Sequence, residues 1–274
     1  MVFLLIFLIL YKRKVIRMGI SEAKAIGKRW SFCADGYNAI IQNEFSGELS
    51  KKWSDLLIGN APCSAGKVLD VGTGPGFFAL LMGSRGWDVH GIDCAEKMIE
   101  TAVANAQKAG IDAEFSVMDS HSLDFPDNTF DYIVGRNVTW ILYEPEKAFK
   151  EWLRVLKPGG RLLYLDGNWH YTLNEDWNAA RKADEAEYRE KYGTPPNSYR
   201  GDEKTEEEFK KLLYFNNILR PDWDIEQLPV FGYEKIKVTP RLNEEVYSEE
   251  KQLLYRSIPL FMVTADKASI PSKL

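Results

Sequence analysis

Strand-like and helix-like hydrophobic patterns alternate along the middle of the chain. Between residues 67 and 167, short continuous apolar runs alternate with stretches whose apolar residues recur at helical spacing. The first apolar run, at 67–71, is followed by a helical stretch that stops at Gly86. Apolar strands that alternate with helices are typical of a parallel sheet covered on both faces. The pattern therefore predicts an α/β fold for this part of the chain.

The pattern changes after Asp166 and returns near Pro221. Residues 167–220 are rich in charged and aromatic side chains and carry no strand signal, but they contain two stretches of helical character. Beyond residue 221, the pattern predicts a helix, a strand, a further helix over 241–257 and a last strand. We therefore expect a helical insertion between two parts of one sheet.

The amino terminus carries an apolar run followed by a basic cluster. MVFLLIFLIL precedes YKRK, which is the reverse of the order found in a secretory signal peptide. A helix of that length spans about 15 Å, or half of the apolar core of a bilayer. We interpret residues 1–17 as an extension from an upstream start or as a poorly ordered segment. A short anchor at the membrane surface is the alternative.

Composition and charge narrow the classes of protein. The 274-residue chain has a net charge of −5, so it lacks the basic excess typical of nucleic-acid-binding proteins. Its three cysteines and three histidines are far apart and fit no metal-binding spacing. The odd number of cysteines favours reduced thiols over a disulfide framework. We expect a cytoplasmic protein with no metal, no nucleic-acid partner and no stable insertion into a membrane.

The segment VLDVGTGPGFFAL places three glycines at a predicted strand-to-helix turn. Gly72, Gly74 and Gly76 permit unusual backbone angles and let a ligand contact the main chain. A dinucleotide-binding loop would read G-x-G-x-x-G, but Phe77 occupies the place of its third glycine and Pro75 removes one backbone donor. A ligand without phosphates fits this loop better. A purely structural turn is the alternative.

Polar residues follow the next two predicted strands. Asp93 ends the second strand, where a carboxylate can accept hydrogen bonds from both hydroxyls of a ribose. Asp119 and Ser120 follow the third strand, in a position to contact the edge of an adenine. Because the carboxyl ends of parallel strands meet at one edge of a sheet, we expect these residues and the glycine turn to line one crevice.

Four segments, in this order and spacing, resemble the motifs of class I S-adenosylmethionine-dependent methyltransferases. They are VLDVGTGPGFFAL, HGIDCAEKMIETA, FSVMDSHSLDFPDNTFDYIVGRNVTW and EWLRVLKPGGRLLYLD. The likeness is to the branch that includes the ubiquinone/menaquinone-type small-molecule enzymes, and it covers about residues 60–170, and 221–266 more loosely. It implies a Rossmann-like sheet of seven strands, mostly parallel with the last strand antiparallel, with helices on both faces and a helical lid.

The resemblance also implies an order of domains. After the extension at 1–17, which the apolar and basic pattern indicates, it implies N-terminal helices over the site at 18–60, the cofactor-binding core at 61–167, the lid at 168–220, and a closing helix and strands at 221–270. We expect the insertion, together with the helix around Trp30–Tyr37, to cover the methyl group and form the acceptor pocket. The reason is that the insertion leaves the sheet at the edge where the cofactor is expected.

The resemblance further implies contacts with S-adenosylmethionine. The glycine turn, with Thr73, would pass under the methionine part of the cofactor, Asp70 would hold its amino group, and Asp93 its ribose. The other implied contacts are Cys94 and Met98 beside the adenine, Asp119 and Ser120 at its edge, Arg136 and Asn137 beside the sulfonium, and Tyr37 over the methionine. Ordinary packing is the alternative for Cys94, Met98 and Tyr37.

The implied activity is methyl transfer to a small-molecule acceptor by in-line displacement, with S-adenosylhomocysteine as the product. This chemistry depends mainly on positioning, and a base is needed only where the acceptor loses a proton. His170 and Tyr171 are the candidate catalytic residues, with Asp166 and His121 as further candidates and packing as the alternative for each. A protein or other macromolecular acceptor and a non-catalytic cofactor-binding module are the alternative functions.

Overall fold

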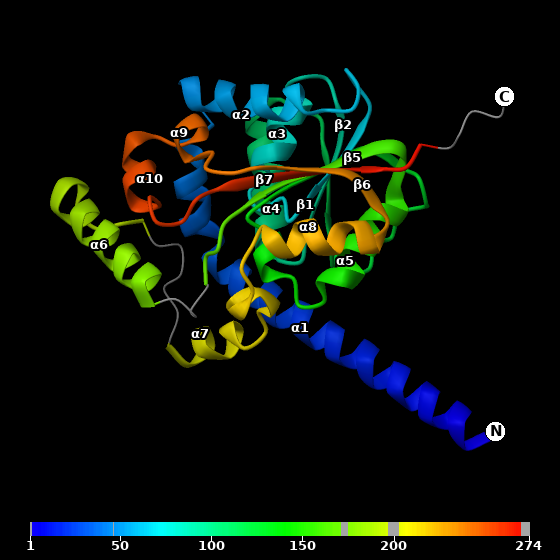
Figure 1. The fold of residues 1–274 in the computed structure, drawn as a ribbon. Helices are drawn as coiled ribbons and strands as arrows, with labels where there is room; N and C mark the ends of the chain where they lie inside the picture. Colours follow the sequence, from blue (N-terminus) through cyan, green and yellow to red (C-terminus); the bar gives the residue numbers. More distant parts are fainter. Residues whose placement is uncertain (1, 46, 171–174, 197–202, 270–274) are drawn as a thin grey trace.

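A seven-strand sheet forms the centre of the structure, a computed structural model that describes residues 2–45, 47–170, 175–196 and 203–269 (Figure 1). The strands are β1 (Lys67–Val71), β2 (Asp88–Asp93), β3 (Glu114–Val117), β4 (Phe130–Arg136), β5 (Leu156–Asp166), β6 (Tyr233–Thr239) and β7 (Phe261–Lys267). Their order is β3-β2-β1-β4-β5-β7-β6, and only the pairings of β7 are antiparallel. The predicted fold class is therefore confirmed.

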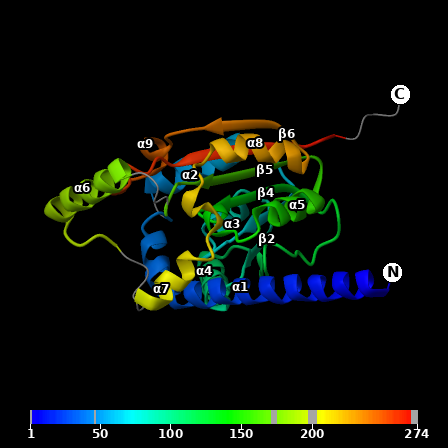
Figure 2. The ribbon, with the colours of Figure 1, turned by 60° about the horizontal axis from the view of Figure 1, so that its bottom comes forward.

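Helices lie on both sides of the sheet (Figures 1 and 2). The helices are α1 (Val2–Gln42), α2 (Gly47–Gly59), α3 (Phe77–Gly83), α4 (Glu96–Ala109), α5 (Pro145–Val155), α6 (Glu175–Tyr192), α7 (Glu203–Lys210), α8 (Asp222–Phe231), α9 (Asn243–Val246) and α10 (Glu249–Leu254), with 3₁₀ turns η1 (Thr139–Ile141) and η2 (Tyr214–Asn217). Where the sequence predicts one helix over 241–257, the structure has the two short helices α9 and α10.

Two apolar cores lie on the two faces of the sheet. One packs α5 and α8 against the strands through Phe149, Trp152 and Leu228. The other packs α2 and α3 through Trp53 and Phe78. Because the central strands are covered on both faces, their sequences are continuous apolar runs rather than alternating ones.

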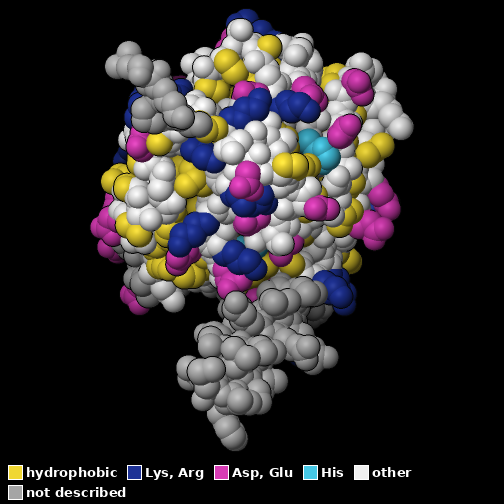
Figure 3. All heavy atoms as spheres, turned by 90° about the vertical axis from the view of Figure 1, so that its right-hand side faces the viewer, with side chains coloured by type: hydrophobic (Ala, Val, Ile, Leu, Met, Phe, Trp, Pro, Cys, Tyr) yellow, Lys and Arg dark blue, Asp and Glu magenta, His cyan; other side chains and the backbone are white. Residues whose placement is uncertain are grey.

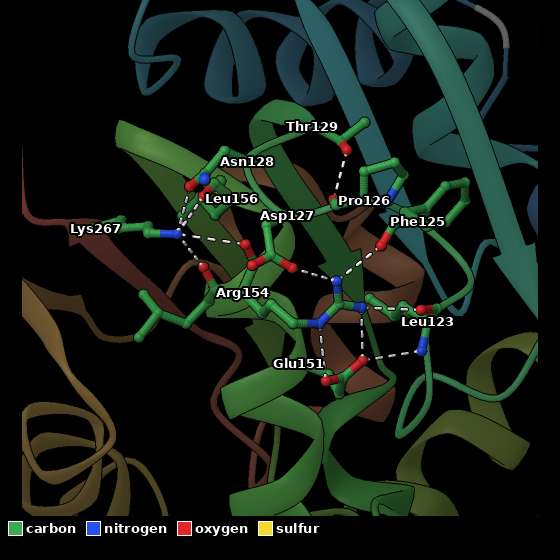
Figure 4. Close-up of polar contacts among 11 residues, drawn as sticks. Leu123, Phe125, Pro126, Asp127, Asn128, Thr129, Glu151, Arg154, Leu156 and Lys267 are labelled. Atoms are coloured by element: carbon green, nitrogen blue, oxygen red, sulfur yellow. Dashed lines mark hydrogen bonds and ion pairs between the residues drawn. The ribbon is translucent and has the colours of Figure 1, made fainter.

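A polar cluster stabilises the end of the sheet at which β4 and β5 begin (Figure 4). The Lys267 ammonium, at the end of β7, donates to the carbonyls of Arg154 and Leu156, where α5 ends. The Arg154 guanidinium donates to Asp127 in the loop before β4. The Lys267 ammonium thus supplies a donor to carbonyls at and just after the end of α5, where the helix itself offers none. Seen from outside in Figure 3, this side of the molecule carries interspersed acidic and basic side chains.

Helix α1 is continuous from Val2 to Gln42, and its first half projects away from the sheet (Figures 1 and 2). The boundary expected after residue 17 lies inside this helix. No helix among the described residues combines the length and the apolar character needed to cross a membrane. The second half of α1 lies close against the loop after β2, because a Cβ atom at Gly27 would be only 2.4 Å from the carbonyl oxygen of Cys94.

The insertion after β5 contributes α6 and α7 at the carboxyl edge of the sheet (Figure 1). Helix α6 is attached to the segment before β7, since the Asp184 carboxylate accepts hydrogen bonds from the Arg256 guanidinium and from the Ser257 backbone. The Tyr188 hydroxyl also donates to Glu250 in α10. These contacts place α6 beside α10, at the end of the sheet where β5 gives way to the insertion.

Candidate functional site

A narrow cavity of about 60 Å³ lies at the carboxyl ends of the parallel strands. Ten of the residues identified from the sequence line it: Tyr37, Gly72, Gly74, Asp93, Cys94, Met98, Asp119, Ser120, Arg136 and Asn137. They come from α1, from α4 and from the loops or ends of β1, β2, β3 and β4. The structure therefore brings them to one edge of the sheet, where parallel strands end and α/β folds bind ligands.

The glycine turn after β1 has a backbone that other residues rarely adopt. Gly72 and Gly74 have φ angles of +63° and +53°. A Cβ atom at Gly72 would lie 2.3 Å from Cγ2 of Val138, so this glycine lets the turn approach the loop after β4. Gly76 begins α3 and faces Ala102 in α4 rather than the cavity. Two of the three glycines thus present main chain to the cavity.

Asp70 lies beneath the turn and outside the cavity lining. Its Oδ2 accepts hydrogen bonds from the Thr73 hydroxyl at 2.7 Å and from the Ala79 backbone N–H at 2.9 Å. Burial raises the pKa of Asp70 to about 7, although both hydrogen bonds act in the opposite direction. In this geometry Asp70 and Thr73 stabilise the turn from below, and a direct contact of either with the cofactor stays a prediction.

Asp93 faces the cavity from the end of β2. Its Oδ2 accepts the Gly74 N–H at 3.0 Å, and its Oδ1 accepts the Ala95 N–H at 2.9 Å. Burial raises the pKa of Asp93 to about 6, against the opposing effect of these two amides. Each carboxylate oxygen can accept a second hydrogen bond. The side chain is therefore able to hold the glycine turn and to accept two ligand hydroxyls.

Asp119 belongs to a hydrogen-bonded group with two rings. Its Oδ1 accepts from Nδ1 of His121 at 2.7 Å, and its Oδ2 from the Tyr143 hydroxyl at 2.6 Å. The two rings stack with centroids 3.8 Å apart. Burial alone would raise the pKa of Asp119. The hydrogen bonds from His121 and from the Tyr143 hydroxyl outweigh burial and leave the pKa below its usual value. Because Nε2 of His121 accepts the Glu144 N–H at 3.4 Å, both ring nitrogens are engaged, which argues against His121 as the base.

Arg136 and Asn137 differ in what they offer a ligand. The Arg136 guanidinium donates to both carboxylate oxygens of Glu44, at 2.5 and 3.2 Å, and lies 4.4 Å from the centroid of the Trp53 ring. The Asn137 Oδ1 atom is buried and has no hydrogen-bond partner among the described residues. A buried acceptor without a partner is costly, so this oxygen points to a missing donor such as a ligand N–H or O–H.

A second cavity of about 470 Å³ adjoins the first and shares four lining residues with it. These are Trp30, Tyr37, Arg136 and Asn137. The remaining wall comes from Arg29, Ile40 and Ile41 of α1, from Trp140, from the insertion through Trp169, His170, Arg181, Pro196 and Glu206, and from the segment around α10. Its volume is within the range of roughly 300–1,000 Å³ that small-molecule sites occupy.

The sequence analysis missed several lining residues of both cavities. Tyr143 lines the first cavity, and no local pattern distinguishes it from a core residue. Tyr247, Lys251 and Tyr255 line the second. Their spacing of four residues would place them on one face of the single helix expected over 241–257, but in the structure only Lys251 lies within a helix, while Tyr247 follows α9 and Tyr255 follows α10.

The candidate bases have different surroundings. Asp166 has no exposed surface and accepts hydrogen bonds from Thr139, Trp140 and Trp169, so the structure does not support it as a base. His170 lines the second cavity and stacks on the Trp140 ring with centroids 5.0 Å apart. Burial lowers the pKa of His170 to about 4, which leaves a neutral imidazole near pH 7. Tyr171 lies outside the described residues.

Comparison with known families identifies the central part of the chain. Residues 69–164 match a family model described as "Methyltransferase domain". The chain is 37% identical over 118 residues to the uncharacterized methyltransferase YcgJ of Bacillus subtilis, covering 42% of this chain and 46% of that protein. It is 37% identical over 114 residues to demethylmenaquinone methyltransferase of Thermus thermophilus, covering 41% and 50%. The chain thus spans about half the length of these curated relatives.

Solved structures share the fold over most of the chain. The [4+2]-cyclase SpnF is 18% identical with a TM-score of 0.62, covering 90% of this chain and 97% of that one. A phosphoethanolamine N-methyltransferase 2 of Haemonchus contortus, in complex with phosphomonomethylethanolamine and S-adenosylhomocysteine, is 20% identical with a TM-score of 0.54, covering 84% and 59%. At these identities the likeness shows the fold alone. With the domain match, it confirms the resemblance to class I methyltransferases.

Proposed function

We propose that this protein transfers a methyl group from S-adenosylmethionine to a small-molecule acceptor. The observation that carries the proposal is the pair of adjoining cavities with a common wall at Trp30, Tyr37, Arg136 and Asn137. Such a wall lets two ligands meet while each keeps its own binding surface. A curated relative named for a quinone-type acceptor, demethylmenaquinone methyltransferase, also supports a small organic substrate.

The first cavity fits the cofactor by the chemistry of its lining. Gly72 and Gly74 present bare main chain, Asp93 has lone pairs for two hydroxyls, and Asn137 has an unpaired buried acceptor. When bound, S-adenosylmethionine supplies a methyl group on a positively charged sulfur, which an acceptor can attack without prior activation of the methyl group. In the proposal, Asp93 holds the ribose, Cys94 and Met98 flank the adenine, and Asp119 and Ser120 bind the adenine edge.

Helix α1 acts as a cover in this proposal. Its residues Ala23, Ile26, Trp30 and Tyr37 line the first cavity, which at about 60 Å³ is much smaller than a nucleoside site. To admit a ligand as large as a nucleoside, α1 or its side chains must move outwards. Their return would exclude water from the reacting atoms. Trp30 and Tyr37 also belong to the second cavity, so the same movement would shape the acceptor site.

His170 is the described side chain best placed to receive a proton in the second cavity. Its imidazole is neutral near pH 7 because burial lowers its pKa to about 4. A base with so low a pKa removes a proton only from an acidic group or at a late stage of transfer. Positioning therefore carries most of the rate enhancement in this proposal, an effect worth up to about 7–11 kcal/mol.

Calorimetry with S-adenosylhomocysteine and NAD tests the cofactor assignment. We expect binding of S-adenosylhomocysteine and no binding of NAD, because Phe77 stands where a dinucleotide loop has its third glycine and Pro75 lacks an N–H. Transfer of labelled methyl from S-adenosylmethionine to components of a metabolite extract then tests the reaction. NAD binding without a response to S-adenosylhomocysteine would contradict the proposal, and cofactor binding without any methyl transfer would favour a non-catalytic module.

The affinity for S-adenosylhomocysteine should decrease as the pH falls below about 6. In the empty site burial raises the pKa of Asp93 to about 6, and the ionised carboxylate is the form that accepts two hydroxyls. Binding therefore favours loss of the proton, and the affinity should fall by at most roughly tenfold per pH unit below that value. Calorimetry between pH 5 and 8 measures this effect. A flat profile would argue against contact between Asp93 and the ribose.

A further inference from the structure

The second cavity is lined by more positive than negative charge. Its basic side chains are Arg29, Arg136, Arg181 and Lys251. Arg29 is paired with Glu206, at 3.0 Å. Arg136 and Lys251 are both bonded to one carboxylate, that of Glu44. Four basic groups therefore share two carboxylates in this part of the described structure.

Arg181 has the least compensated charge of the four. It extends from α6, and its Nη1 donates to the carbonyl oxygen of Trp169 at 3.1 Å. No carboxylate of a described residue lies within ion-pair distance of it, and Glu185 on the same helix is paired with Arg189. Burial lowers the pKa of Arg181, although the negative charge of Glu185 acts in the opposite direction. A half-buried guanidinium without an acidic partner favours the approach of an anion.

Aromatic rings form the rest of the cavity wall. The wall includes Trp30, Tyr37, Trp140, Trp169, Tyr247 and Tyr255. The Trp169 ring meets the Tyr255 ring edge to face, with centroids 5.3 Å apart, and the Trp30 and Trp140 rings meet in the same way at 6.3 Å. Rigid aromatic faces of this kind suit a planar apolar ligand.

Arg181 lies between the second cavity and a neighbouring hollow, because it lines both. This hollow beside α6 shares Arg181, Pro196 and Tyr255 with the second cavity. Its other charged lining residues are Lys182, Arg189 and Glu185, and the last two form an ion pair, so a basic excess remains. Basic residues along a path of access attract anions from solution. Arg181 is not one of the four residues that the two cavities share, so an anion held by Arg181 would lie outside that shared wall.

We propose that the second cavity binds an acceptor with a planar apolar body and an anionic group, carboxylate or phosphate, held by Arg181. Lys251 adds to the attraction, and the atom to be methylated points away from Arg181, towards Tyr37 and Asn137. This inference rests on the proposed function, because it assigns the acceptor of that reaction. The pairing of Arg29 with Glu206 leaves Arg181 as the main anchor of the acid group.

Matched acid and neutral probes test the inference on protein saturated with S-adenosylhomocysteine. The pairs are benzoate with benzamide, indole-3-acetate with indole-3-acetamide, and phenyl phosphate with phenol. Calorimetry should show at least one acid binding roughly tenfold or more tightly than its neutral partner, as expected for a charge-assisted hydrogen bond. The phosphate and carboxylate arms then show which oxyanion the site prefers.

Two variants of α6 locate the effect. Arg181→Gln should remove the preference for the acid. Lys191→Gln removes one positive charge from the same helix and should keep it, because Lys191 is fully exposed and lies outside the cavity linings described above. In the parent protein the bound acid should also raise the pKa of His170, because negative charge stabilises the imidazolium. With three histidines in the chain, NMR of labelled imidazole groups can follow this shift.

The inference and the proposed function fail in different ways. If S-adenosylhomocysteine binds and no acid binds more tightly than its neutral partner, the anionic acceptor is wrong while the cofactor assignment stands. An acid preference that survives Arg181→Gln would also overturn the inference, since the anchor would lie elsewhere. Failure of S-adenosylhomocysteine to bind in the first titration would contradict the proposed function itself.

Discussion

Replacing Asp93 with alanine should weaken the binding of S-adenosylhomocysteine by about a hundredfold or more. In the proposed complex the carboxylate accepts two ribose hydroxyls, and hydrogen bonds to a charged group contribute about 1.5–3 kcal/mol each. The structure adds a second effect, because the same carboxylate accepts the backbone N–H groups of Gly74 and Ala95. The variant should therefore also lose stability, by about 1–3 kcal/mol. Calorimetry gives the affinity and denaturant unfolding the stability.

Asp88→Ala is the matched control for this measurement. Asp88 begins the strand that Asp93 ends, and its side chain is exposed and paired with Lys67. An exposed ion pair contributes little to the free energy of unfolding. The affinity of Asp88→Ala for S-adenosylhomocysteine and its stability should therefore both stay close to those of the parent protein. Equal affinities for Asp93→Ala and the parent protein would show that the carboxylate does not contact the cofactor.

Replacing Arg220 with alanine should lower the free energy of unfolding by about 3–5 kcal/mol. The guanidinium donates to both oxygens of Asp224 and to the Thr139 hydroxyl, and it lies 3.6 Å from Asp166. Both carboxylates are completely buried. Removing the cation would leave them without compensation, and breaking a buried ion pair in this way has that cost. Denaturant unfolding measures the change.

The same substitution should weaken ligand binding in the second cavity more than it weakens binding of S-adenosylhomocysteine in the first. Asp166 holds the Trp169 indole at 2.8 Å and the Trp140 backbone at 2.9 Å, and both residues line the second cavity. In protein that remains folded, S-adenosylhomocysteine should still bind. Arg85→Ala, which removes an exposed partner of Asp55, is the control and should leave unfolding nearly unchanged. A similarly small effect of Arg220→Ala would show that the buried carboxylates are protonated or otherwise compensated.

Several contacts of the site could not be read from local sequence. Glu44 pairs with Arg136 across 92 positions, and Arg29 pairs with Glu206 across 177. Charged residues at such separations show no periodicity that links them. Asp166 illustrates the same limit, because its place after a predicted strand suggested a base. Its burial beside Arg220 makes it a structural group, and only the packing of the insertion onto β5 determines that burial.

The sequence by itself determined the sheet, the end of it at which the parallel strands finish, and several of the residues at the first cavity. Apolar periodicity locates the strands, and parallel strands bring their carboxyl ends together, so the sequence alone assigns Gly72, Asp93 and Asp119 to one crevice. Tertiary structure alone decided the second cavity. Its wall combines α1, η1, the insertion and α10, which are far apart in the chain, and its charge depends on which side chains pair. Arg181 is distinctive only because packing brings it to that wall with no carboxylate of a described residue within ion-pair distance, a property that no local pattern encodes.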